Sequence, residues 1–117
     1  MARILVAEDD SSMRDFLSLS LGQKGHEVVL TNDGGSALEA LREHHFDLLI
    51  ADIVMPVMDG IALALSAGAE KPDLPVILMT GYSAEQNRAH NLSSLVGAVI
   101  AKPFTVAQLD TLIDSVV

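Results

Sequence analysis

The sequence contains no cysteine and no tryptophan, and it has only one tyrosine and three phenylalanines. The absence of cysteine excludes disulfide bonds, thiolate catalysis, iron–sulfur clusters and zinc sites built on cysteine. Basic residues are also scarce, since seven stand against sixteen acidic residues and the net charge is −9. Because nucleic acids and anionic membranes bind proteins through basic faces, this balance argues against both as direct partners.

Long hydrophobic runs are missing as well. Only four apolar residues separate Arg3 from Glu8, which is too short for the core of a signal peptide, and no later stretch reaches the length of a membrane span. We therefore expect a cytoplasmic protein. The 117 residues, half of them hydrophobic, suffice for one compact core. We expect a single domain over residues 1–117, with no output domain attached.

Five short apolar runs, rich in valine, isoleucine and leucine, recur along the chain. They do not alternate polar with apolar residues, which is typical of strands buried on both faces of a sheet. The runs are Ile4–Ala7, Val28–Leu30, Leu48–Ala51, Val76–Met79 and Val99–Ala101.

Longer segments with apolar residues at helical spacing separate these runs and follow the last one. They predict five helices, around residues 13–21, 37–41, 61–70, 84–95 and 106–116. Thr105 followed three residues later by Gln108 is typical of a capping box at the start of the last helix. The segment 84–95 is polar, and we expect it to be the most mobile helix. The alternation predicts an α/β fold, a doubly wound five-stranded parallel sheet with helices on both faces.

Polar side chains stand where four of the predicted strands end: Glu8-Asp9-Asp10, Asp52, Thr80 and Lys102. Ligands of open parallel sheets bind beyond the carboxyl ends of the strands. Two carboxylates about 5 Å apart repel by about 3 kcal/mol at an effective dielectric constant of about 20, so a proton, a lysine or a metal ion must offset that cost. Because the candidate ligand atoms are all oxygens, the expected metal ion is Mg²⁺, which would keep an open coordination face for a phosphate.

With such an ion bound, Asp52 is a candidate nucleophile toward phosphorus, and Thr80 and Lys102 are candidates to hold the other phosphoryl oxygens. Each residue taken alone has an ordinary structural explanation, as a helix cap, a solvated charge or a strand residue. Their common placement at one edge of the sheet is what favours phosphoryl transfer.

Four segments together resemble the receiver domain of two-component response regulators, and the resemblance covers the whole chain. They are residues 4–10, 47–60, 75–81 and 101–104, with the sequences ILVAEDD, DLLIADIVMPVMDG, PVILMTG and AKPF. The resemblance implies the flavodoxin-like strand order 2-1-3-4-5. It implies a phosphoprotein of bacterial two-component signal transduction that uses Mg²⁺. Such a protein is not an enzyme for other substrates, because it catalyses only its own phosphorylation and dephosphorylation.

The resemblance also implies roles around the metal. Asp52 resembles the phosphoacceptor and a metal ligand. Glu8 and Asp9 resemble the acidic pair, with Asp9 bound directly and Glu8 acting through water, and the backbone carbonyl of Val54 matches the third protein ligand. Asp10 lies one place beyond the pair and fits a cap of the first helix.

Thr80 resembles the switch hydroxyl and Lys102 the phosphate-binding lysine, whose peptide bond to Pro103 is implied to be cis. Many receivers carry an aromatic residue three places before this lysine, but here Val99 stands there and the only tyrosine is Tyr82. Two interpretations stay open. Either Val99 is simply part of the core and switching uses the loop and the helix over 84–95, or Tyr82 replaces the missing aromatic residue.

A second departure concerns hydrolysis of the phosphoaspartate. Residues two places after Asp52 and Thr80 flank the path of the attacking water, and here they are Val54 and Tyr82. Val54 has no group to bind the water and Tyr82 is bulky enough to block it. This predicts slow self-dephosphorylation.

The resemblance implies two kinds of partner. A histidine kinase or a histidine phosphotransfer protein donates the phosphoryl group. A downstream protein binds one phosphorylation state, through the face formed by the helix over 84–95, the strand over 99–101 and the helix over 106–116. The alternative is a relay that passes the phosphoryl group onward. Val99 and the Thr80-Gly81-Tyr82 loop are similar to those of CpdR-type cell-cycle regulators, which control proteolysis.

Two other classes fit the residues less well. An Mg²⁺-dependent phosphatase with an aspartate nucleophile usually carries a second carboxylate two residues later, where Val54 stands. A flavodoxin-like cofactor protein needs a Ser/Thr/Gly-rich phosphate loop after the first strand, where Glu8-Asp9-Asp10 would repel a phosphate.

Overall fold

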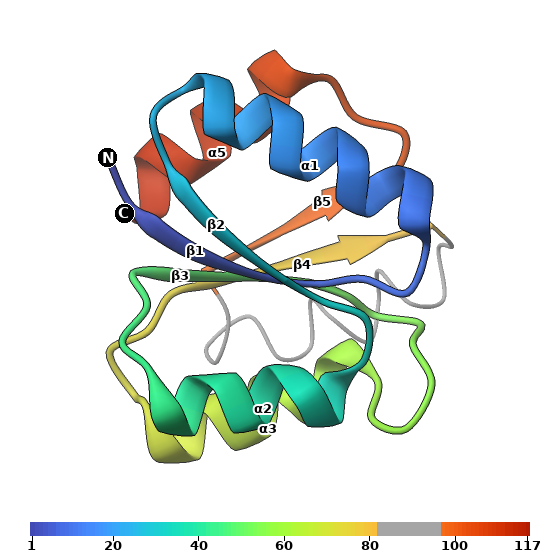
Figure 1. Ribbon diagram of the computed structural model, residues 1–117, viewed down its shortest axis with the longest axis vertical. Helices are drawn as coiled ribbons and strands as arrows, with labels where there is room; N and C mark the ends of the chain where they lie inside the picture. The colour runs from blue at the N-terminus through green and yellow to red at the C-terminus, as the bar shows by residue number, and fades with distance from the viewer. Residues whose placement is uncertain (82–96) are drawn as a thin grey trace.

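The computed structural model describes residues 1–81 and 97–117. Within these ranges, five parallel strands form one sheet in the order β2-β1-β3-β4-β5, as predicted (Figure 1). The strands are β1 (Arg3–Ala7), β2 (Glu27–Thr31), β3 (Leu48–Asp52), β4 (Val76–Thr80) and β5 (Ala98–Ala101). The described helices are α1 (Ser11–Gln23), α2 (Gly34–Glu43), α3 (Gly60–Glu70) and α5 (Val106–Val116). The predicted helix over 84–95 lies outside the described residues.

The helices cover both faces of the sheet. In Figure 1, α1 and α5 lie on one face and α2 and α3 on the other. Leu17 and Leu21 of α1 pack with Leu109 and Ile113 of α5 in one apolar cluster, and the inner side chains of α2 and α3 form a second cluster across the sheet. The central strands β3 and β4 are buried along their whole length, which explains their uninterrupted apolar sequences. Among the described residues, no helix has the length and apolar character needed to cross a membrane.

Each described helix begins after a residue whose side-chain oxygen accepts a backbone N–H bond. These N-caps are Asp10, Asp33, Asp59 and Thr105. The capping box between Thr105 and Gln108 is confirmed, and so is the cap at Asp10. Asp10 and Thr105 closely follow the ends of β1 and β5, so these two caps help to fix the loops that carry Glu8, Asp9 and Lys102.

Candidate metal centre at the strand ends

Backbone pairing fixes the strand ends on which the site residues stand. The N–H of Glu8 donates to the carbonyl of Thr31 at 3.1 Å, and the N–H of Lys102 donates to the carbonyl of Thr80 at 2.7 Å. Pairing thus continues one residue beyond β1 and β5. Asp52 and Thr80 are the last residues of β3 and β4, and the side chain of Thr80 is fully buried. All four predicted positions therefore lie at the same edge of the sheet.

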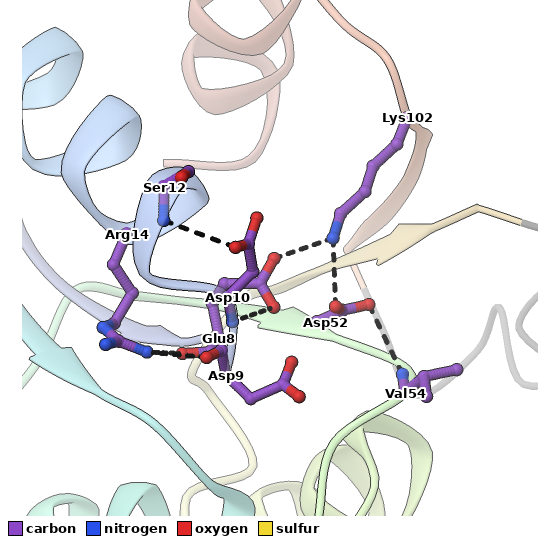
Figure 2. Close-up of polar contacts among 8 residues, drawn as sticks. All are labelled: Glu8, Asp9, Asp10, Ser12, Arg14, Asp52, Val54 and Lys102. Atoms are coloured by element: carbon purple, nitrogen blue, oxygen red, sulfur yellow. Dashed lines mark hydrogen bonds and ion pairs between the residues drawn. The ribbon is translucent and has the colours of Figure 1, made fainter.

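Three carboxylates converge at this edge (Figure 2). One oxygen each from Glu8, Asp9 and Asp52 lie within 4.8 Å of one another. Glu8 and Asp52 are buried, whereas Asp9 is exposed. The Nζ of Lys102 donates to Glu8 Oε1 at 2.7 Å and to Asp52 Oδ2 at 3.0 Å. One ammonium facing three carboxylates leaves the cluster short of positive charge, which favours a divalent cation.

The environment shifts the pKa values of two of these groups. Burial raises the pKa of Glu8 to about 7, and the neighbouring Asp52 carboxylate adds to the rise while Lys102 opposes it. Burial alone would lower the pKa of Lys102, but its hydrogen bonds and charge interactions with Glu8 and Asp52 outweigh that effect and raise it. Lys102 therefore stays an ammonium, and ionised Glu8 is costly without further positive charge.

Hydrogen bonds from two sides fix the orientation of the Asp52 carboxylate. The Oδ2 atom accepts from Lys102, and Oδ1 accepts from the backbone N–H of Val54 at 3.3 Å. An open cavity of about 560 Å³ adjoins Asp52, and Asp9 and Met13 are among the residues that line it. A reacting group can therefore approach Asp52 from solvent next to the acidic cluster.

The start of α3 packs directly against the backbone of Asp52. The N–H of Gly60 donates to the carbonyl of Ile53 at 2.8 Å. A Cβ atom added at Gly60 would overlap the carbonyl group of Asp52. Glycine is therefore required at this position by the close approach of two backbones.

The loop between β3 and α3 contains a strained residue. Val57 has φ of 70°, and the N–H of Met58 donates to the carbonyl of Pro56 at 2.8 Å. This three-residue turn with positive φ is rare, and a β-branched side chain makes it costly. The side chain of Val57 is 87% exposed, so packing does not explain its presence.

The predicted residues have different outcomes. The structure brings Glu8, Asp9, Asp52 and Lys102 together, but the roles assigned to them and to Thr80 and the Val54 carbonyl stay predictions. The Lys102–Pro103 bond is cis. The interpretations that involve Tyr82 lie outside the described residues. Val99 is half-buried and packs against the apolar cluster on the α2–α3 face, in agreement with the core interpretation.

Sequence reasoning missed Arg14. In Figure 2 its guanidinium reaches back from α1 to the loop that carries the acidic pair. The Nη1 atom donates to the backbone carbonyls of Glu8 at 2.9 Å and Asp9 at 3.0 Å. No sequence signal marks such a contact, because every residue has a backbone carbonyl.

Comparison with known proteins adds to this geometry. The profile of the response regulator receiver domain matches residues 4–114. The chain is 43% identical to the response regulator receiver protein CpdR of Brucella abortus (strain 2308) over 109 residues, which cover 93% of this chain and 91% of CpdR. It is 36% identical to the transcriptional activator protein PfeR of Pseudomonas aeruginosa over 113 residues, but these cover only 37% of PfeR.

Solved structures with the same fold include two that contain magnesium. The response regulator TrrA of Thermotoga maritima, in complex with Mg²⁺–BeF, superimposes with a TM-score of 0.91 at 30% identity, and the match covers 100% of both chains. The receiver domain of the sensor histidine kinase PA1611 of Pseudomonas aeruginosa, with magnesium coordinated in its active-site cleft, gives 0.89 at 25% identity over 98% of this chain and 96% of that one.

Proposed function

This chain belongs to the response regulator receiver family, and from that premise we propose that Asp52 accepts a phosphoryl group from a phosphohistidine and thereby switches the binding of a partner protein. The observation that carries the proposal is the cluster of carboxylate oxygens from Glu8, Asp9 and Asp52 within 4.8 Å, with the ammonium of Lys102 on two of them. In this proposal the protein acts in a bacterial two-component phosphorelay in the cytoplasm.

The donor set fits Mg²⁺. The candidate ligands are hard oxygens, and the proposed set is Asp9 and Asp52 directly, Glu8 through water, and the backbone carbonyl of Val54. Mg²⁺ prefers such oxygen ligands and retains several waters, which suits a cluster with one exposed member and an open cavity beside it. When bound, the ion neutralises the negative charge that develops during phosphoryl transfer.

The protein's own groups perform the remaining steps. A carboxylate oxygen of Asp52 attacks the phosphorus of the donor, the N–P bond breaks, and its electron pair returns to the imidazole nitrogen. The bonds from Lys102 and from the Val54 N–H hold the nucleophile in orientation before the attack. Lys102 and the hydroxyl of Thr80 then bind the non-reacting oxygens of the acyl phosphate.

Intact-mass spectrometry after treatment with phosphoramidate or acetyl phosphate and Mg²⁺ tests this chemistry. We expect one added phosphoryl group on the wild type and none on Asp52→Ala. Asp10→Asn is the matched control, because asparagine preserves the N-cap of α1 and Asp10 is outside the proposed ligand set. An unmodified wild type, or an adduct that persists in Asp52→Ala, would contradict the proposal.

Output through protein–protein contact fits a chain with net charge −9, which disfavours nucleic acid as a partner. The proposed partner surface includes β5 and α5 and the segment 84–95, the last of which lies outside the described residues. A relay is the alternative function. Transfer of the phosphoryl group from the modified chain to a purified histidine phosphotransfer protein would favour the relay, and state-dependent retention of a partner on immobilised protein would favour the binding switch.

A further inference from the structure

We infer that Arg14 is a positioning residue that aims the acidic pair at the metal, an inference that rests on the proposed Mg²⁺ site. A single nitrogen, Nη1, bonds the carbonyls of Glu8 and Asp9 at 2.9 and 3.0 Å (Figure 2). Arg14 does not touch the cluster through these bonds. It acts through the backbone carbonyls of the two residues that carry the carboxylates, Glu8 and Asp9.

The loop that Arg14 holds has few other restraints. The N–H of Glu8 makes the last sheet bond, to Thr31. The two side-chain bonds within the turn are long, from the Asp10 N–H to Glu8 at 3.5 Å and from the Ser12 N–H to Asp10 at 3.4 Å. Between these two points Asp9 is exposed, although its carboxylate must lie beside two buried ones. The charge-assisted bonds from Arg14 hold the backbone carbonyls of both acidic residues, whereas the bond from Lys102 holds only the end of the Glu8 side chain.

The sign of the effect on metal affinity separates this role from simple electrostatics. A guanidinium near the cluster repels a cation, so removal of its charge alone would tighten Mg²⁺ binding. Loss of a positioning contact does the opposite, because the acidic pair must then be ordered when the metal binds. Residues that orient metal ligands typically change affinity by about 10-fold to 100-fold when mutated.

Isothermal titration with MgCl₂ on the full chain tests the inference with Arg14→Met, which removes both the charge and the donors. We expect the affinity to fall about tenfold. Arg14→Lys should retain affinity to within about threefold, because one ammonium carries enough donors for both carbonyls. Arg42→Met is the control, since it removes an arginine that pairs with Glu70 on α3, and it should leave Mg²⁺ affinity unchanged.

Hydrogen exchange of the Asp9 and Asp10 amides in EDTA gives a readout that needs no metal. Exchange should be faster in Arg14→Met than in the wild type, with Arg14→Gln as a second variant if the methionine protein does not fold. Equal or tighter Mg²⁺ binding by the variant, or unchanged exchange, would overturn the inference. If the wild type itself bound no Mg²⁺, the proposed function would fail, and the exchange rates would still decide whether Arg14 holds the turn.

Discussion

Ionisation of Glu8 should make the metal-free protein less stable as pH rises. Burial raises the pKa of this carboxyl in the folded state from 4.5 to about 7. A group whose pKa is higher in the folded state contributes stability that is fully present below its unfolded pKa and is lost as pH rises through its folded pKa. The loss from Glu8 therefore falls between pH 4.5 and about 7. Between about pH 5.5 and about pH 8 it amounts to about 2 kcal/mol, at about 1.4 kcal/mol per pKa unit.

Two other carboxyls with shifted pKa values do not affect the pH dependence over the range in which Glu8 ionises. The backbone hydrogen bond from Arg3 lowers the pKa of Asp47 from 3.8, and the ion pair with Arg42 lowers that of Glu70 from 4.5. A depressed pKa contributes stability above the unfolded value and loses it as pH falls through the folded value. Over the range used for Glu8, these contributions are nearly constant.

Urea denaturation followed by far-UV circular dichroism measures the effect, since the chain has no tryptophan to report on unfolding. In EDTA the wild type should lose about 2 kcal/mol more than Glu8→Gln between the two pH values. Saturating Mg²⁺ should stabilise the wild type more at the higher pH, because the ion binds the ionised cluster and displaces a proton. Identical pH dependence for wild type and Glu8→Gln in EDTA would refute the reasoning.

Three further predictions concern the loop and the helix that follow Asp52. Gly60→Ala should lower the free energy of unfolding by about 3 kcal/mol in the same denaturation assay, because its Cβ overlaps the Asp52 carbonyl. Gly68→Ala, in the last turn of α3 where a Cβ meets no neighbouring atom, should raise the free energy of unfolding by about 0.5 kcal/mol. Equal effects of the two substitutions would contradict the packing argument. Val57→Gly should raise the free energy of unfolding by about 1 kcal/mol, because glycine adopts a positive φ without strain. Val54→Gly, in the same loop but without a positive φ, should not raise the free energy of unfolding. A lower free energy of unfolding for Val57→Gly would show that no strain is stored at this residue. Val54→Asn should speed decay of the acyl phosphate on Asp52, followed by intact mass after removal of the phosphoryl donor, and unchanged decay would count against the water-access argument.

The strands and helices could be predicted closely where burial is complete. The apolar run Leu48–Ala51 matches β3 except for the last residue of the strand, because β3 ends in the polar Asp52. The edge strand β2 extends one residue beyond its apolar run at each end, to Glu27 and Thr31, because edge residues are only partly buried and polar side chains are tolerated there. Helix α3 begins at Gly60, one residue before the apolar pattern starts, because the Asp59 side chain caps it.

The candidate site was predictable to the extent that its residues break the apolar pattern of the strands. Acidic residues at the ends of β1 and β3 and a lysine after β5 oppose hydrophobic burial, and such local conflicts mark functional positions. Arg14 and Val57 break no such pattern. The first bonds backbone carbonyls, which exist at every position, and the unusual feature of the second is a dihedral angle rather than a residue type. The types of side chain at the site can therefore be predicted from the sequence, whereas the backbone geometry that orients these side chains is seen only in the structure.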